Sequence, residues 1–390
     1  MIESDTVAGS DHQLLGTNPA MRRAWLAHNT GQDLVAVADT AFAPEDVRAN
    51  IENLVGATHV PLGVAGPILV NGQDARGWYH VPFATTEGTL VSTYQYGMRA
   101  ISKAGGANTR VLGDALDITP CFVVGDLDEA LRLAGWLHEH LADLRGVAAE
   151  MTSHGRLEEI RTHVFGRRVM AQCVFTTGDA MGMNMVNLAV DQICRHVMEH
   201  ADCRRYYLRC NYSSDKKPAA LNLFRSYGKE IAVDITLPAS VVETDLGVAP
   251  ADLLDFAAAG RIGTAQAGTF GMNAHFANGL AAVYLACGQD IAQIVNASIG
   301  FIEIEALENG DVYVAARLPN LIVGTVGGGT RLPTQRECLA LMRCDGDGHA
   351  RRFAEIVAAT VVAGDLAISA ALANGRFIDA HRSKRGAAGA

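Results

Sequence analysis

Residues 121–144, CFVVGDLDEALRLAGWLHEHLADL, decide the fold because they join a short apolar run to a longer amphipathic one. The first part is typical of a strand and the second of a helix. The same order returns in RRVMAQCVFTTG (167–178) and MNMVNLAVDQICRHVMEH (183–200). Strands alternating with helices in this way predict a small α/β or α+β sandwich over residues 119–207, inserted in a larger domain.

The segments on either side of this insertion predict the larger domain. The expected limits are 46–118 and 220–390 for the larger domain, 1–45 for a partly helical lead-in and 208–219 for a connecting loop. Before the insertion, TTEGTLVSTYQYGMRAISKAGG (85–106) predicts a helix with Glu87 in its first turn. After it we expect a strand, an Ala/Gly-rich helix, two strands and an apolar helix, at 230–242, 273–290, 300–307, 311–319 and around 353–375.

Composition excludes several classes of protein. The chain has 390 residues, of which 49% are hydrophobic and 19% charged, so it can bury a large core in two or three domains. A net charge of −10 disfavours nucleic acid or an anionic membrane surface as a partner. Asp365 interrupts the apolar run 356–375, which therefore predicts a buried helix rather than a membrane span. The start of the chain has no signal-peptide pattern, so we expect a cytoplasmic protein.

The cysteines predict neither a metal site nor disulfides. All eight are scattered along the chain without a CxxC pair or a neighbouring pair of histidines. That spacing does not suit zinc and fits reduced, mostly buried thiols. We therefore expect no metal.

Three polar segments could carry chemistry. In CNYSSDKKPAALN (210–222), Lys216 is either part of a solvated loop or held to stabilise developing negative charge. In GDAMGMN (178–184), Asp179 is a plausible N-cap, and the helix start could bind a pyrophosphate or simply pack. The glycines of GTVGGGT (324–330) could cradle a phosphate or only make a tight turn.

Four further residues are ambiguous when taken singly. His275 and Asn278 lie three apart on an apolar helix, where a buried structural histidine is the simpler interpretation. Asp290 follows YLACGQ in apolar company and needs a partner, which a lysine would supply. His381, in FIDAHRSKRG, could be an ordinary residue of the tail.

Taken together, these segments resemble one family. ENLVGATHVPLGVAGP, TTEG, GDAMGMN, DKKPAALN, NAHFAN, GQDIAQ and GTVGGGT occur in the order and spacing of the catalytic domain of hydroxymethylglutaryl-CoA (HMG-CoA) reductases, closer to the class I form. The resemblance implies an α/β (α+β) fold. Its large substrate domain would contain a long central helix and carry an inserted, small ferredoxin-like cofactor domain.

The resemblance also implies a reaction, the NADPH-dependent four-electron reduction of HMG-CoA to mevalonate and CoA, with NADH as an alternative cofactor. Lys216 matches the lysine that stabilises the oxyanion, and Glu87 the carboxyl that donates a proton to the reduced oxygen. Asp290 matches an aspartate linked to both. His381 matches the histidine that protonates the departing CoA thiolate.

Binding residues follow from the same match. Those expected to bind the acyl-CoA substrate are Arg209, Asp215, Lys217, Asn278 and His275. Those expected to bind the cofactor are Asp179, Ala180, Met181, Gly182, Met183 and Asn184. Family members form active sites across a dimer interface, so we expect a homo-oligomer that binds neither nucleic acid nor membrane.

Several positions depart from the family pattern. Ile118 stands where an arginine ordinarily pairs with the distal carboxylate of the substrate, and Arg209 stands where serine is usual. Tyr96 replaces an arginine that contacts CoA phosphate, and residues 152–154 lack the arginine that grips the 2′-phosphate of NADPH. Three alternatives remain: an HMG-CoA reductase in which Arg209 holds the carboxylate, a reductase of another branched acyl thioester, or a catalytically idle homologue.

Overall fold

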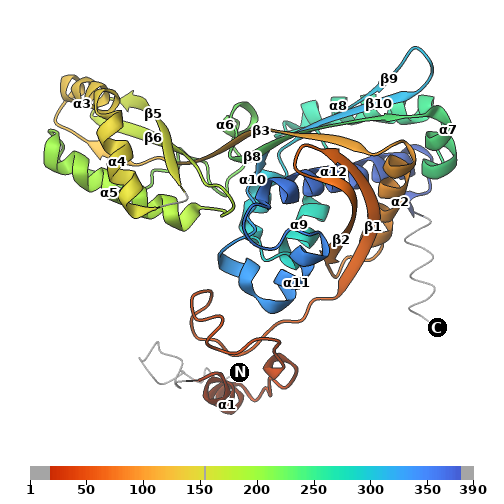
Figure 1. Cartoon of the computed structure of the whole chain (residues 1–390), viewed down its shortest axis with the longest axis horizontal. Helices are drawn as coiled ribbons and strands as arrows, with labels where there is room; N and C mark the ends of the chain where they lie inside the picture. The colour runs from red at the N-terminus through yellow and green to blue at the C-terminus, as the bar shows by residue number, and fades with distance from the viewer. Residues whose placement is uncertain (1–17, 153–154, 379–390) are drawn as a thin grey trace, which may run out of the picture.

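The strand β3 (Ala107–Ile118) joins the two parts of the fold. The computed structural model describes residues 18–152 and 155–378 (Figure 1). The first part of β3 pairs in parallel with β1 (Leu62–Gly72) and antiparallel with β8 (Gly228–Leu237). Its last three residues pair with β6 (Arg168–Thr176). One continuous strand therefore runs from the larger body into the smaller one.

The larger body is built around a long buried helix. Its strands pair in the order β2, β1, β3, β8, β10 and β9, where β2 is Arg76–Ala84, β10 Val312–Leu321 and β9 Phe301–Ala306. The helix α12 (Ala350–Ala373) packs against α2 (Leu90–Lys103) and α9 (Phe276–Ala286). Among the described helices α12 alone is long and apolar enough to cross a bilayer, but 78% of its most apolar window is buried inside the fold. The prediction of a buried helix is confirmed.

The smaller body has the expected ferredoxin-like arrangement. Its elements follow the order β4 (Cys121–Val123), α3 (Leu127–Glu139), α4 (Leu141–Met151), β5 (Arg156–Phe165), β6, α5 (Met183–His200) and β7 (Arg205–Tyr207). The strands pair antiparallel in the order β7, β4, β6, β5, which is the split βαβ pattern. This body has a hydrophobic core of its own. The limits of the domains stay a prediction.

The remaining elements complete the fold. They are α1 (Pro19–Thr30), η1 (Ala36–Ala38), α6 (Leu221–Phe224), α7 (Ala239–Val241), η2 (Val242–Leu246), α8 (Pro250–Ala267), η3 (Ile291–Gln293), α10 (Ile294–Ala297), η4 (Gly328–Arg331) and α11 (Pro333–Leu341). The helix α1, which has no buried residue, lies on an arm apart from the main body (Figure 1). This helix fits the expected lead-in.

Two predicted helices are shorter than expected. The helix predicted at 85–106 begins only at Leu90, because Thr89 adopts a left-handed φ of 74°, so Glu87 lies in the preceding turn and not in the helix. The helix predicted at 273–290 is confined to Phe276–Ala286, and Gly288, at φ 67°, turns the chain beyond its end. In the smaller body β5 was not predicted, and the helix predicted at 127–144 is divided at His140.

Candidate functional site

Lys216 meets Asp290 in an ion pair. The lysine lies in the loop between β7 and α6, and Asp290 caps η3 by accepting a hydrogen bond from Ala292 N–H. Lys216 Nζ and Asp290 Oδ2 are 2.7 Å apart, and the two side chains are 39% and 29% exposed. Lys216 is therefore not a freely solvated charge, and Asp290 has the lysine partner that its sequence context called for. Both groups remain accessible to a ligand.

The loop that carries Lys216 has an unusual backbone. Asn211, Ser214 and Lys216 have φ values of 66°, 52° and 55°, in the left-handed region that non-glycine residues rarely adopt. Each such residue costs about 1–3 kcal/mol, so the surrounding contacts must hold the loop in place. One of them is the hydrogen bond from Lys217 N–H to the Ser214 carbonyl, at 3.2 Å.

Asp215 is buried beside Lys216 and is hydrogen-bonded to several polar side chains. Its carboxylate is bound on both oxygens, by Arg209 Nη1 at 2.8 Å and by Gln293 Nε2 at 2.9 Å. Lys217 Nζ donates to the Asp215 main-chain carbonyl at 3.1 Å. Arg209 also donates from Nε to Asn187 on α5 at 3.0 Å. Arg209 thus connects the start of α5 to the lysine loop.

Ile118, whose identity raised the question of substrate, does not line this site. Its side chain is fully buried in the core of the smaller body. In the described structure it therefore offers no surface to a ligand.

Glu87, Asn278 and His275 form a second group. Asn278 Nδ2 donates to the Glu87 carboxylate, at 3.2 Å from Oε1 and 3.1 Å from Oε2. His275 is buried against Tyr94, whose ring lies 5.4 Å away and nearly parallel. Burial lowers the pKa of His275, and the nearby Glu87 charge opposes that shift. In the described part of the chain no hydrogen bond or ion pair joins Glu87 to Lys216 or Asp290, so that link stays a prediction.

Asp365 on α12 supports the second group from within the core. Its Oδ2 accepts hydrogen bonds from the backbone N–H groups of Ala274 and His275, at 2.7 and 2.8 Å. The side chain is 1% exposed, and this burial raises the pKa of Asp365 to about 6. The aspartate that argued against a membrane span thus anchors the start of α9.

The variant Asp365→Asn tests this anchoring role through its effect on the free energy of unfolding. Because the folded-state pKa lies above the ordinary value of 3.8, stability is lost as the pH rises from that value to about 6, and the loss is complete above it. Relative to the asparagine variant, the wild type should therefore lose about 3 kcal/mol of unfolding free energy between about pH 4 and pH 8. Urea titrations of both proteins at several pH values measure this difference. A constant difference would show that Asp365 does not titrate in this range.

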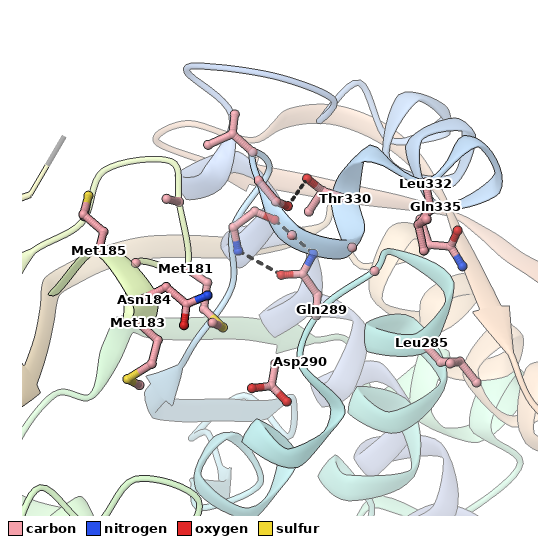
Figure 2. A pocket seen from close by; sticks show the side chains of 18 residues that line it. Met181, Met183, Asn184, Met185, Leu285, Gln289, Asp290, Thr330, Leu332 and Gln335 are labelled. Carbon is pink, nitrogen blue, oxygen red and sulfur yellow. Dashed lines mark hydrogen bonds between the residues drawn. The ribbon is translucent and has the colours of Figure 1, made fainter. Parts of the chain in front are cut away.

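A cleft of about 470 Å³ brings three of the quoted motifs together (Figure 2). The segment 180–185 forms one wall, and residues 288–290 and 324–330 face it. Gln289 joins the last two segments through paired 2.9 Å hydrogen bonds between its amide and the backbone of Gly324. A Cβ on Gly329 would lie 2.6 Å from the Gly288 carbonyl oxygen, so the two loops can approach only as glycines.

Asp179 does not have the predicted capping role. The N-cap of α5 is Gly182, at φ 89°. Asp179 instead accepts hydrogen bonds from the N–H groups of Gly348 and Ala350 at the start of α12, at 2.7 and 3.0 Å. The reason is positional, because Asp179 lies three residues before the N-cap and its backbone pairs with Thr325.

The cleft suits the pyrophosphate of a dinucleotide. The first N–H groups of the 18-residue helix α5 come from Met183, Asn184 and Met185, which line it. Among the described lining residues Asp290 is the sole charged one, so a bound anion would rely on helix N–H groups. The predicted cofactor residues Ala180 to Asn184 all line the cleft, whereas Asp179 is not among its lining residues.

One predicted site residue lies outside the described structure, and several residues that support the site were not predicted from the sequence. His381 lies outside the described residues. Gln293, Asn187 and Asp117 hold the loop or its partners and were not predicted. Asn187 and Asp117 are ordinary polar residues in elements with no recognisable motif, so no sequence signal marks them, whereas Gln293 ends the quoted GQDIAQ segment, which could have singled it out.

The comparisons with known proteins point to one family. The family model for hydroxymethylglutaryl-coenzyme A reductase matches residues 18–385. The 3-hydroxy-3-methylglutaryl-coenzyme A reductase of Aeropyrum pernix is 42% identical over 370 residues, covering 93% of this chain and 88% of the relative. That of Methanothermobacter thermautotrophicus is 42% identical over 364 residues, covering 93% and 91%.

A solved structure shares the fold. It is that of the class II enzyme from Streptococcus pneumoniae bound to NADPH, with a TM-score of 0.68, 18% identity, and coverage of 92% of this chain and 94% of the other. At this identity the likeness concerns the fold alone, and the closer resemblance to class I stays a prediction.

Proposed function

Because the chain belongs to the hydroxymethylglutaryl-coenzyme A reductase family, we propose that it reduces HMG-CoA to mevalonate and CoA with NADPH. The observation that supports this most is the Lys216–Asp290 ion pair, whose aspartate lines the cleft of the GDAMGMN motif. The assay is oxidation of NADPH or NADH in the presence of HMG-CoA. Turnover of other acyl-CoAs alone would favour the second alternative, and no turnover at all would favour an idle homologue.

In this proposal each catalytic residue has a separate role in the two successive reductions. NADPH supplies the two hydrides. The Lys216 ammonium stabilises the oxyanion that forms when the thioester carbonyl is reduced, and Asp290 holds that ammonium in place. The carbon–sulfur bond then breaks, and His381 protonates the leaving thiolate. Glu87 gives a proton to the oxygen that becomes the alcohol.

The role of His381 can be tested separately. Only thioester reduction expels a thiolate, so His381→Gln should impair reduction of HMG-CoA and spare reduction of free mevaldehyde. Steady-state rates on the two substrates measure this. Equal losses on both would remove the role as the acid for the leaving group.

The choice between NADPH and NADH depends on whether positively charged side chains of the protein bind the 2′-phosphate at the adenosine end of the cofactor. Two of the arginines that could replace the missing 2′-phosphate ligand already have acidic partners, Arg156 with Glu158 at 2.7 Å and Arg161 with Glu159. Both pairs are exposed, so a phosphate could still compete for them. We propose NADPH, and a higher kcat/KM with NADH would reverse that choice.

Arg209→Ser tests the substrate assignment. Losing a charge-assisted contact to the distal carboxylate should raise the KM for HMG-CoA by roughly 10–100-fold, since such a contact contributes about 1.5–3 kcal/mol. In the structure all three of its nitrogens already have partners, in Asp215, Asn187 and the Met183 sulfur, so the carboxylate would have to share this arginine. Arg205→Ser is the matched control, because among the described residues the hydrogen bond and ring contact of the Arg205 side chain are both with the exposed Tyr207. Steady-state kinetics decide, and an unchanged KM would favour a substrate without that carboxylate.

We also propose a cytoplasmic homo-oligomer. The end of α8 and the turn after it are largely exposed although they are rich in small and apolar residues, and Ile262 and Phe270 are 61% and 40% exposed. Such a surface is typical of a subunit interface. Sedimentation equilibrium of the wild type and of Ile262→Arg checks this, and a monomeric wild type would contradict it.

A further inference from the structure

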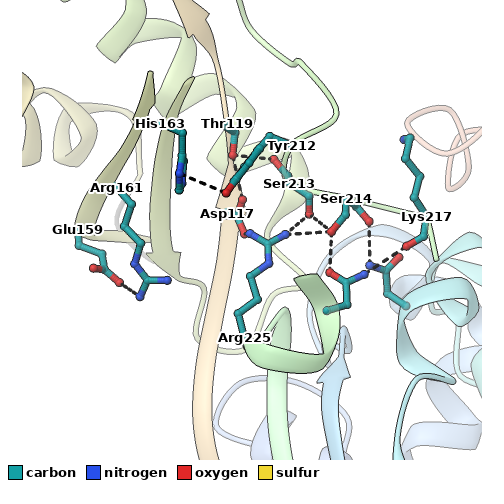
Figure 3. A network of polar contacts seen from close by, with 12 residues as sticks. Asp117, Thr119, Glu159, Arg161, His163, Tyr212, Ser213, Ser214, Lys217 and Arg225 are labelled. Atoms are coloured by element: carbon teal, nitrogen blue, oxygen red, sulfur yellow. Dashed lines mark hydrogen bonds and ion pairs between the residues drawn. The ribbon is translucent and has the colours of Figure 1, made fainter. Parts of the chain in front are cut away.

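A buried arginine stands behind the lysine loop. Arg225 follows α6, and its side chain is 7% exposed. Nη1 pairs with Asp117 Oδ1 on β3 at 2.5 Å, and Asp117 is 3% exposed. The guanidinium also lies 5.4 Å from the centre of the Tyr227 ring. Figure 3 shows it between β3 and the loop.

The other end of this guanidinium binds the loop itself. Arg225 Nη2 donates to the Ser213 carbonyl and to Ser214 Oγ, the latter at 3.1 Å. Thr119 connects the same parts, because it donates to Asp117 Oδ2 at 3.1 Å and accepts from Ser213 Oγ at 3.2 Å. The backbone just before Lys216 is thus tied to β3 by buried, charge-assisted hydrogen bonds.

A second set of hydrogen bonds fixes the backbone on either side of Lys216. Ser214 Oγ donates to Asn222 Oδ1 at 2.6 Å, and Asn222 Nδ2 donates to the Lys217 carbonyl at 3.2 Å. Asn296 Nδ2 donates to the Ser214 carbonyl at 3.0 Å. None of these hydrogen bonds involves the side chain of Lys216. They act on the left-handed backbone at Ser214 and Lys216, which would otherwise relax.

We propose that Arg225, held by Asp117, is a positioning residue that fixes the loop so that the Lys216 ammonium stays beside Asp290. The proposal rests on the proposed role of Lys216. Its physical basis is that a guanidinium can bridge a carboxylate on one element and a carbonyl on another, which a single ammonium cannot reproduce. A misplacement of Lys216 by about 1 Å would cost about 10²-fold in rate.

The test needs variants that do not leave a buried charged group without its partner. Burial raises the pKa of Asp117 and the Arg225 guanidinium opposes that shift, so removing Arg225 alone would leave the carboxyl without its counter-charge. We therefore choose Arg225→Lys and the double variant Asp117→Asn/Arg225→Met. Glu355→Gln is the control, because Glu355 is also buried and, within the part of the chain that the structure describes, its carboxylate binds only the backbone N–H groups of residues 73–75.

The kinetic result separates positioning from general stability. With HMG-CoA and NADPH, the double variant should lose about 10²-fold in kcat with little change in either KM, and Arg225→Lys should lose about tenfold. Glu355→Gln should keep its kcat. In a Lys216→Ala background the double change should cost nothing further, because both act through the same ammonium. An unchanged kcat in a folded double variant, or a full additional loss in that background, would overturn the proposal.

Hydrogen exchange measures how firmly the backbone of the loop is held, and it does not depend on turnover. In the double variant the amides of residues 213–217 should exchange faster, while those of residues 73–75 stay protected as in the wild type. Faster exchange across the whole chain, or an unchanged loop, would contradict positioning by Arg225. If Lys216→Ala itself kept normal turnover, the proposed role of Lys216 would fail, and the exchange result would still report whether Arg225 holds the loop.

Discussion

Lys216→Ala is expected to lower kcat by about 10²–10³-fold or more, with the fold and the affinity for the cofactor retained. The ammonium stabilises charge that develops only in the transition state, so its loss should appear in kcat more than in KM. The side chain is 39% exposed and has one ion-pair partner, so removing it creates no cavity in the core. Stopped-flow and steady-state measurements of NADPH oxidation give the rate, and circular dichroism gives the fold.

Lys103→Ala provides a matched control for this prediction. Lys103 is also an exposed lysine in an ion pair, with the buried Asp245 at 2.6 Å, but it lies at the end of α2 and does not line the cleft. We expect it to keep its kcat. Near-normal turnover of Lys216→Ala would contradict the role of this lysine in stabilising the oxyanion.

Gly97→Ala is expected to lower the free energy of unfolding by about 3 kcal/mol. Gly97 lies on the buried face of α2, where that helix packs on α12. A Cβ there would stand 1.8 Å from the carbonyl oxygen of Ala363, so the two helices would have to move apart. Overpacking of this kind costs about 1–3 kcal/mol and sometimes more, which exceeds the gain of about 1 kcal/mol in helix propensity. Thermal and urea unfolding measure the change.

The same substitution at Gly135 should have the opposite sign. Gly135 lies on an exposed face of α3, and a Cβ there meets nothing within 4 Å. Gly135→Ala should therefore stabilise the protein by roughly 0.5–1 kcal/mol. If both variants behaved alike, the close approach of α2 and α12 would not be what makes a glycine necessary at 97.

Much of the fold could be predicted because its signals are local. The helix of α5 has the predicted limits, 183–200, since its apolar period runs unbroken from the Met183 segment to His200. The buried helix around 353–375 was predicted from its apolar length and a single aspartate. The strand β5 was missed because charged residues at 156, 158, 159 and 161 hide its alternation.

For the site, the sequence alone determined which motifs belong together, because seven short segments in one order identify a family without any coordinates. Only the tertiary structure decided which atoms meet. It pairs Lys216 with Asp290 and places Asp179 at the start of α12 instead of α5. It also buries Ile118 in the core. The physical reason is that hydrogen bonds and ion pairs depend on distances between segments far apart in the chain, and side-chain identity alone does not encode them.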